Sequence, residues 1–130
     1  VGISAPPTFM FGRELSLSQQ AAWFQRGLEC LRDCPAHRRW VSLEPLSFDV
    51  SKILAETDCP LDWAVIGAAS AGGKTFQPDV EHLCRAQDAL HCPVFYKGNL
   101  CSELALRAFS LQAAIAPLRW DSWRGEFPEL

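Results

Sequence analysis

Short apolar segments alternate with longer helix-like segments along this chain, and the alternation restricts the folds that it can adopt. Four segments look like strands: VGIS (1–4), RRWVSLEP (38–45), LDWAVIGAAS (61–70) and CPVFYKG (92–98). Apolar residues recur at helical spacing in the segments between and after them, at 16–34, 49–57, 78–91 and 102–116. Alternating strands and helices form a parallel sheet through right-handed crossovers. The sequence therefore predicts a single α/β domain over residues 1–130, built from repeated βα units.

The ends of the predicted strands are spaced like the repeats of a barrel. A (β/α)8 barrel of ~250 residues uses about 31 residues for each strand and helix, so four such units resemble half of a barrel. A small doubly wound sheet is the alternative. Half of a barrel leaves two open sheet edges. We therefore expect the C-terminal part of a larger barrel protein, in which the missing N-terminal half or another chain, as in a homodimer, covers those edges.

The composition argues against several classes of partner. The 130 residues are 48% apolar and 21% charged, with a net charge of -3, so the chain is globular and nucleic-acid binding is not indicated. No apolar run approaches the roughly 20 residues that a membrane helix needs. The six cysteines include no CxxC pair, which favours free thiols in a reducing cytoplasm. The three histidines lack the ligand spacing of a zinc site, and we expect no metal site.

A Gly-rich segment raises the possibility of a nucleotide site. Residues 68–75, AASAGGKT, match the phosphate-loop pattern and would place Lys74 against a phosphate. A working phosphate loop runs directly into a helix. Here Pro78 favours a helix that begins near that residue, which leaves Lys74 in the loop. We therefore favour an ordinary βα loop in which Gly72 and Gly73 provide flexibility, with a nucleotide binder as the less favoured alternative.

Polar residues stand at the ends of the four predicted strands. These residues are Ser4, Glu44, Ser70 and Lys97, and the carboxyl ends of barrel strands are where functional groups gather. A carboxylate and an ammonium that converge there can bind a polar ligand or carry out acid–base chemistry. They can equally form a structural ion pair at the mouth of the barrel. The sequence leaves both interpretations open.

Several blocks of the sequence, taken in order, carry a family resemblance. The blocks are VGIS, RRWVSLEPL, LDWAVIGAAS and QPDVEHLCRAQDALHCPVFYKG. They resemble successive segments of a phage-type family of unknown function whose members are similar to radical S-adenosylmethionine (SAM) proteins and occur in phages and bacteria. The resemblance covers most of residues 1–100. It implies a radical-SAM-like (β/α) barrel with SAM and a [4Fe-4S] cluster as cofactors of the full-length parent.

The resemblance also implies roles for particular residues. Glu44 in SLEP and Lys97 in VFYKG match family positions and are the candidate catalytic residues. Ser4, Gly67 and Ser70 lie where such barrels approach SAM, and they are the candidate cofactor-binding residues. If these roles hold, the Gly-rich segment lies beside SAM and not beside ATP.

The chain departs from the family pattern at one of these positions. Where the family has Gly-Gly-Glu-Ser, this sequence has GAAS, so Ala68 replaces a glycine and Ala69 replaces the glutamate. The carboxylate that the family provides at this position is therefore absent from this chain. The three cysteines that a radical SAM cluster needs would lie in the earlier half of the parent. The isolated chain is therefore expected to be catalytically inactive.

The C-terminal segment, 111–130, is rich in tryptophan. Its last part, WDSWRGEFPEL, is weakly similar to the closing segment of the same family. We expect this tail to cover a sheet edge. The alternative is that Trp120 and Trp123, with neighbouring arginines, stack on a nucleobase.

Overall fold

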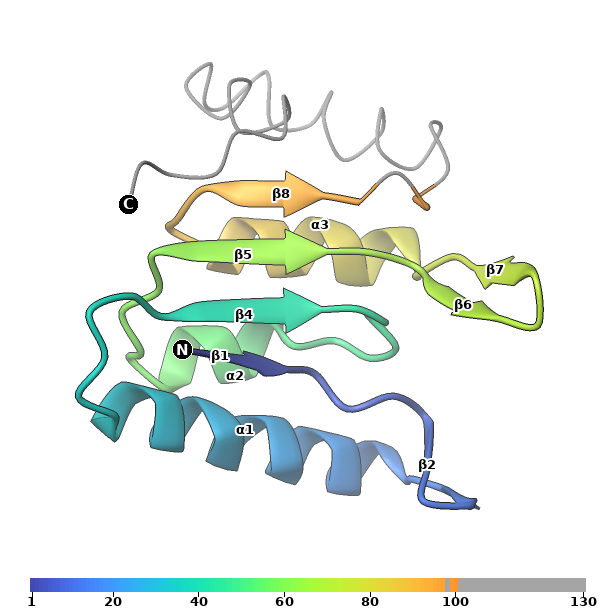
Figure 1. Ribbon diagram of the computed structural model, residues 1–130, viewed down its shortest axis with the longest axis horizontal. Coiled ribbons are helices and arrows are strands. Elements are labelled where there is room, and N and C mark those ends of the chain that lie inside the picture. Colours follow the sequence, from blue (N-terminus) through green and yellow to red (C-terminus); the bar gives the residue numbers. More distant parts are fainter. Residues whose placement is uncertain (98, 101–130) are drawn as a thin grey trace.

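A parallel sheet forms the centre of the molecule. The computed structural model describes residues 1–97 and 99–100. Its main sheet has the strand order β1-β4-β5-β8, and all neighbouring strands are parallel (Figure 1). The four strands are β1 (Gly2–Ser4), β4 (Trp40–Leu43), β5 (Trp63–Ile66) and β8 (Val94–Tyr96). The predicted α/β class with a parallel sheet is confirmed.

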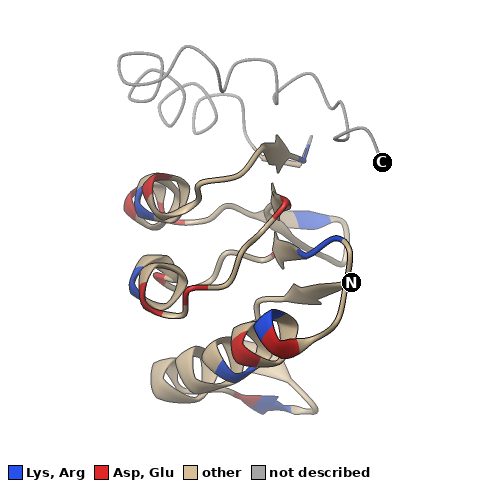
Figure 2. Ribbon diagram, turned by 90° about the vertical axis from the view of Figure 1, so that its left-hand side faces the viewer, with Lys and Arg blue, Asp and Glu red and all other residues tan. Residues whose placement is uncertain are grey.

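Helices in the described part of the chain cover one face of this sheet (Figure 2). They are α1 (Leu17–Asp33), α2 (Ser51–Glu56) and α3 (Val80–Ala89). The strands are neighbours in the order in which they occur along the chain. A doubly wound sheet reverses its strand order and carries helices on both faces. The arrangement of the described residues is therefore singly wound.

Helix α1 follows directly from the sequence pattern. Ser16 accepts a hydrogen bond from the Gln19 amide, and the Gln19 side chain accepts one from the Ser16 amide, so the two residues form a capping box. Phe24 and Leu28 of its apolar face are buried. Leu17, the first residue of the helix, is 70% exposed.

The two shorter helices begin later than the sequence predicts. Val50, and not Asp49, occupies the N-cap position of α2, while the Asp49 carboxylate accepts hydrogen bonds from the Ser51 amide and hydroxyl. Helix α3 has Asp79 as its N-cap, with a side chain that accepts from two backbone amides. Pro78 therefore lies outside the helix and not in its first turn.

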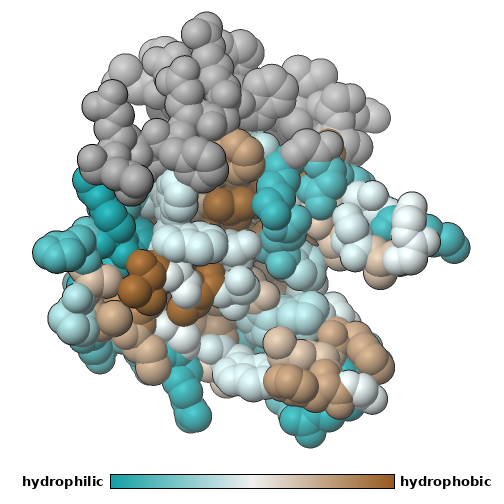
Figure 3. All heavy atoms as spheres, viewed as in Figure 1, coloured by the Kyte–Doolittle hydropathy of each residue, from teal (hydrophilic) through white to brown (hydrophobic). Residues whose placement is uncertain are grey.

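The two faces of the sheet differ in composition. Every second side chain of a strand points toward the helices. These side chains form the buried core together with Phe24, Leu28 and Leu83 of the helices. The opposite face begins with Trp40 and Trp63, which are paired across β4 and β5 and make an edge-to-face ring contact at 5.8 Å. Figure 3 views the molecule from the side of this face, where apolar and polar side chains are mixed.

Two β-hairpins extend beyond the carboxyl ends of the strands and were not predicted (Figure 1). The first joins β2 (Phe9–Met10) to β3 (Arg13–Glu14), and the second joins β6 (Ala69–Ala71) to β7 (Lys74–Phe76). The expected third strand, 61–70, is therefore divided. Its apolar part ends at Ile66, and its last residues belong to the second hairpin.

Some predictions concern residues outside the described part of the chain. The expected helix at 102–116 and the Trp-rich segment 111–130 both lie there. Within the described residues, none of the helices combines the length and the apolar character that a membrane crossing requires. The described cysteines Cys30, Cys34, Cys59 and Cys84 are free thiols, as expected.

Candidate functional site

Glu44 and Lys97 meet at the carboxyl edge of the sheet. Nζ of Lys97 lies 2.5 Å from Oε2 of Glu44. Each residue follows a strand directly. The Lys97 amide donates to the carbonyl of Ile66 at 2.9 Å, and the Gly67 amide donates to the carbonyl of Leu43 at 3.2 Å, so backbone hydrogen bonds connect the ends of β4, β5 and β8. The Lys97 side chain is 45% exposed and that of Glu44 is 22% exposed. The ion pair is thus partly buried, with an ammonium group that remains accessible to a ligand.

Gly67 lies between these two residues in the sheet. The register pairs Leu43 with Ile66, and Ile66 with Tyr96, so the next residue of each strand falls in one row: Glu44, Gly67 and Lys97. A Cβ atom on Gly67 would lie 2.9 Å from the Glu44 carboxyl carbon. The absence of a side chain at Gly67 therefore gives the Glu44 carboxylate its position above the sheet.

Asn99 completes the cluster, although the sequence analysis did not identify it. Its side-chain amide donates to the Ala68 carbonyl at 2.7 Å and lies 3.3 Å from Oε1 of Glu44. Its side-chain oxygen accepts from the Ala68 amide at 3.1 Å. An asparagine soon after a strand-end lysine was the available signal, because the loop after a parallel strand carries side chains over the same edge. We call Glu44, Lys97 and Asn99 the edge cluster.

The two predicted serines have different positions. Oγ of Ser70 lies 3.4 Å from Nδ2 of Asn99, so Ser70 borders the edge cluster from the second hairpin. Ser4 pairs with Ser42 in the sheet register. The structure therefore brings Glu44, Gly67, Ser70 and Lys97 together, while Ser4 lies at the end of β1, the strand next to β4.

The Gly-rich segment does not have the geometry of a phosphate loop. Lys74 is the first residue of β7 and pairs with Ala71 across the hairpin. Gly72 and Gly73 form its two-residue turn, with φ angles of 57° and 76°. Helix α3 begins only at Val80. A phosphate loop requires its lysine at the N-terminus of a helix, so the favoured interpretation of an ordinary connection agrees with the fold, although the glycines shape a turn and do not provide flexibility.

Metal and thiol chemistry receive no support from the described residues. Among residues 1–97 and 99–100, no group of three or more histidine, cysteine, aspartate or glutamate side chains is arranged to hold a metal ion. Burial raises the pKa of the Cys59 and Cys84 thiols above its ordinary value. These two groups therefore stay protonated near neutral pH, which makes them weak nucleophiles.

The chemistry that the edge cluster offers is recognition of a polar ligand. The ammonium group of Lys97 and the carboxamide of Asn99, which both follow β8, lie within hydrogen-bond distance of the Glu44 carboxylate, which follows β4. The ammonium group of Lys97 has further donors for an anionic group, and the Glu44 carboxylate accepts from a cationic one. A ligand that carries both an anionic and a cationic group can therefore replace the Glu44–Lys97 contact by pairing with each of the two residues.

Comparison with known proteins leaves the family open. No family model, curated protein or solved structure matches this chain. The resemblance to the phage-type family, and the cofactors that it implies, therefore remain predictions.

Proposed function

We propose that the edge cluster binds the charged amino-acid part of SAM, or a similarly charged substrate, in a radical-SAM-like barrel protein to which this chain contributes one half of the barrel. One observation carries the proposal. Glu44 and Lys97, which follow different strands, form an ion pair at the carboxyl edge of a parallel sheet. This edge is where barrel proteins bind their ligands.

The arrangement of the sheet supports the half-barrel part of the proposal. Four strands lie in chain order, and the helices of the described residues cover one face (Figures 1 and 2). In a (β/α) barrel the helices form the outer ring and the other face of the sheet lines the interior. The row of Glu44, Gly67 and Lys97 continues the face of Trp40 and Trp63, which would be that interior.

The charges of the edge cluster suit an amino-acid ligand. A carboxylate on the ligand would pair with Lys97, and an ammonium group would pair with Glu44. Asn99 would keep Glu44 oriented, because its side-chain amide lies between the Glu44 carboxylate and the Ala68 carbonyl. Separating the Glu44–Lys97 pair costs little when a zwitterion replaces each partner, since both charges stay compensated.

The iron–sulfur cluster does not fit the described residues of this chain. They provide no set of metal ligands, so the cluster would be held by cysteines of the other half. No step of the proposal passes through it. The 130-residue chain is proposed to bind ligand without catalysing a reaction by itself.

Isothermal titration calorimetry of the 130-residue chain tests the binding proposal. SAM, S-adenosylhomocysteine and L-methionine share the amino-acid group, so we expect all three to bind. Glu44→Gln and Lys97→Met should each weaken binding by about tenfold, the effect of losing one charge-assisted hydrogen bond. Lys52→Met is the matched control, because it removes an exposed lysine of α2, a helix that covers the other face of the sheet.

The outcomes separate ligand binding from a structural ion pair. Binding that is weakened in both edge variants and unchanged in Lys52→Met supports the proposal. If none of the three ligands binds at millimolar concentration, or if the edge variants bind as tightly as the parent chain, the ion pair is structural. Thermal unfolding of each variant shows whether a loss of binding reflects a loss of fold.

We infer a second candidate function, an assembly domain, from the outer strand β1. Within the described residues, β1 pairs only with β4. The outer edge of such a strand can pair with a strand of another chain. Mass measurement by light scattering distinguishes this function. A stable dimer whose mass does not change in Glu44→Gln would favour assembly, whereas a monomer that binds SAM would favour the first proposal.

A further inference from the structure

Exposed aromatic side chains gather at the first hairpin and the start of α1. Phe9 is 64% exposed, Phe11 is 78% exposed and Trp23 is 43% exposed. The rings of Phe11 and Trp23 are in contact, with centroids 6.0 Å apart. Figure 3 shows apolar atoms over this hairpin, at the lower right. Contiguous exposed apolar surface of this kind marks an interaction site more often than scattered single residues do.

The hairpin presents Phe11 in an unfavourable backbone conformation. Phe11 and Gly12 form a two-residue turn with φ angles of 52° and 74°. Glycine adopts such angles readily, but a bulky side chain rarely does. Because the Phe11 side chain is exposed, packing in the core does not offset the cost of this conformation. Strain of this kind concentrates at sites that bind other molecules, and the exposed ring of Phe11 is consistent with that role.

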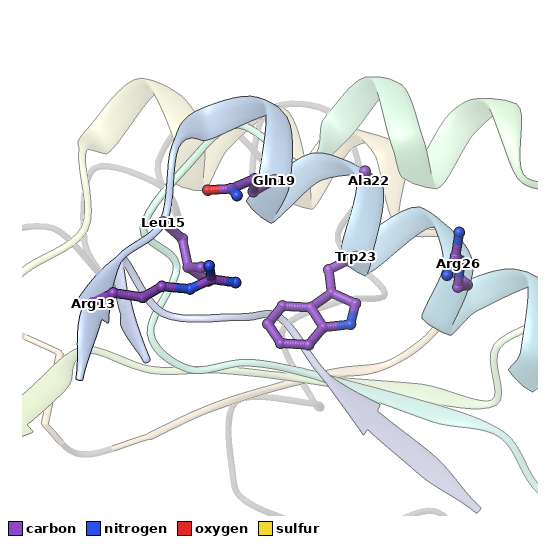
Figure 4. A pocket seen from close by; sticks show the side chains of 6 residues that line it. All are labelled: Arg13, Leu15, Gln19, Ala22, Trp23 and Arg26. Carbon is purple, nitrogen blue, oxygen red and sulfur yellow. The ribbon is translucent and has the colours of Figure 1, made fainter. Parts of the chain in front are cut away.

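A hollow lies beside Trp23. It measures about 240 Å³ and is lined by residues of β3 and α1 and by one residue of the connection between them: Arg13, Leu15, Gln19, Ala22, Trp23 and Arg26 (Figure 4). Sites for small-molecule ligands are larger, about 300–1,000 Å³. The hollow is therefore suited to a single apolar side chain of a larger partner.

Two guanidinium groups flank this hollow. Figure 4 shows Arg13 extending toward the indole ring of Trp23, with Arg26 on the other side of that ring. Within the described residues, neither Arg13 nor Arg26 forms an ion pair. The strand register pairs Arg13 with Met10, and it pairs the next residue, Glu14, with Phe9. The hollow is therefore flanked by two guanidinium groups that have no ion-pair partner among the described residues, although the chain as a whole has a net charge of -3.

We propose that Phe11, Arg13, Trp23 and Arg26 bind an acidic segment of a partner protein, with one aromatic or leucine side chain of that segment in the hollow. Tryptophan and arginine are the residues that most often dominate the binding energy of protein interfaces. Carboxylates of the partner pair with the two guanidinium groups, which bind such groups in a bidentate manner. This surface shares no residue with the edge cluster, so the proposal does not depend on SAM binding.

The charge distribution favours a protein partner over single-stranded nucleic acid. Nucleic acid also stacks on aromatic rings, but its backbone follows an extended positively charged groove. Here the positive charge is confined to two arginines beside one hollow. That arrangement matches a short acidic peptide better than a polyanion.

Fluorescence anisotropy with labelled peptides tests the proposal on the 130-residue chain. The probe is a short peptide with glutamate and aspartate on both sides of one phenylalanine. Two comparison peptides replace either the acidic residues by lysine or the phenylalanine by alanine, and a labelled oligothymidylate represents nucleic acid. We expect the acidic phenylalanine peptide to bind at least about tenfold more tightly than each of these probes, and its binding to weaken as salt is added.

Variants of the chain locate the binding surface. Trp23→Ala and the double variant Arg13→Ala/Arg26→Ala should each weaken binding of the acidic peptide by at least about tenfold. Arg32→Ala is the matched control, because Arg32 lies at the other end of α1 and pairs with Asp33. Since Trp23 is partly exposed, its truncation leaves the core intact, and circular dichroism checks this. Equal binding of the lysine peptide, binding of the oligonucleotide alone, no binding at millimolar concentration, or unchanged binding in the variants would each overturn the proposal.

Discussion

A Cβ atom on Gly67 would lie 2.9 Å from the carboxyl carbon of Glu44. The closeness follows from the sheet register, which places the two residues in one row beyond β4 and β5. We predict that Gly67→Ala displaces the Glu44 carboxylate, because a flexible side chain yields more easily than the sheet backbone. The expected loss of stability is therefore small, about 1 kcal/mol, while binding of SAM weakens by about tenfold.

Calorimetry and chemical denaturation of the same variant separate these two effects. Gly12→Ala is a useful comparison, since a Cβ atom there meets nothing within 4 Å but is strained by a φ of 74°. It should lose stability and keep its affinity for SAM. If Gly67→Ala lost several kcal/mol of stability, Glu44 would be rigidly held and the predicted displacement would be wrong.

The sequence predicts the parts of the fold that depend on repeated local patterns. Helix α1 has an apolar face, a capping box and a following proline, and all of these act within a few residues of one another. The strands β4 and β5 are short apolar runs bounded by polar residues. The site residues Glu44 and Lys97 could be predicted to converge, because parallel strands present their carboxyl ends at one edge.

The parts that were missed depend on turn geometry and on contacts distant in sequence. The Gly72–Gly73 pair is a hairpin signal, but its likeness to a phosphate loop obscured it. The hairpin at Phe11 had no such signal, since phenylalanine rarely adopts a positive φ. Asn99 contacts Ala68 from 31 positions along the chain, a relationship that no local pattern contains.

Gly2 is predicted to be intolerant of a side chain. A Cβ atom there would overlap the indole ring of Trp40, which lies across β1 and contacts the ring of Trp63. Gly2→Ala must move that ring and break the edge-to-face contact. We expect a loss of about 1–3 kcal/mol, as in other overpacked sites, with a change in near-ultraviolet circular dichroism. Gly27→Ala is the milder comparison, because its Cβ atom would meet only the end of the Ile3 side chain at 3.1 Å.

The turn of the second hairpin is predicted to depend on Gly73 and not on Lys74. Gly73 has a φ of 76°, and an alanine in such a conformation costs about 1–2 kcal/mol. Lys74 is exposed on β7, so Lys74→Ala should change stability by less than about 0.5 kcal/mol. Thermal unfolding of both variants measures the difference. A larger loss for Lys74→Ala than for Gly73→Ala would argue against the hairpin.

Asp62 is predicted to make stability depend on pH in the acid range. The Arg39 amide donates a hydrogen bond to the Asp62 carboxylate at 2.7 Å, and the Arg38 guanidinium donates a second one at 2.9 Å. The hydrogen bond from the Arg39 amide has the larger effect and that from Arg38 the next. Both lower the pKa of Asp62 below its ordinary value. An unfolded aspartate has a pKa of about 3.9. The stabilisation is therefore complete above that pH and is lost as the pH falls through the lower pKa of the folded state.

The variant Asp62→Asn should consequently be less stable than the parent chain by about 1 kcal/mol at about pH 7. The difference should shrink below about pH 3.9, where the parent carboxylate becomes protonated. Urea unfolding across this range measures it. Asp88→Asn is the control: Asp88 is exposed on α3, and its replacement should change stability by less than about 0.5 kcal/mol at either pH. A difference between the parent and Asp62→Asn that grew on acidification would contradict the link between Asp62 and the two arginines.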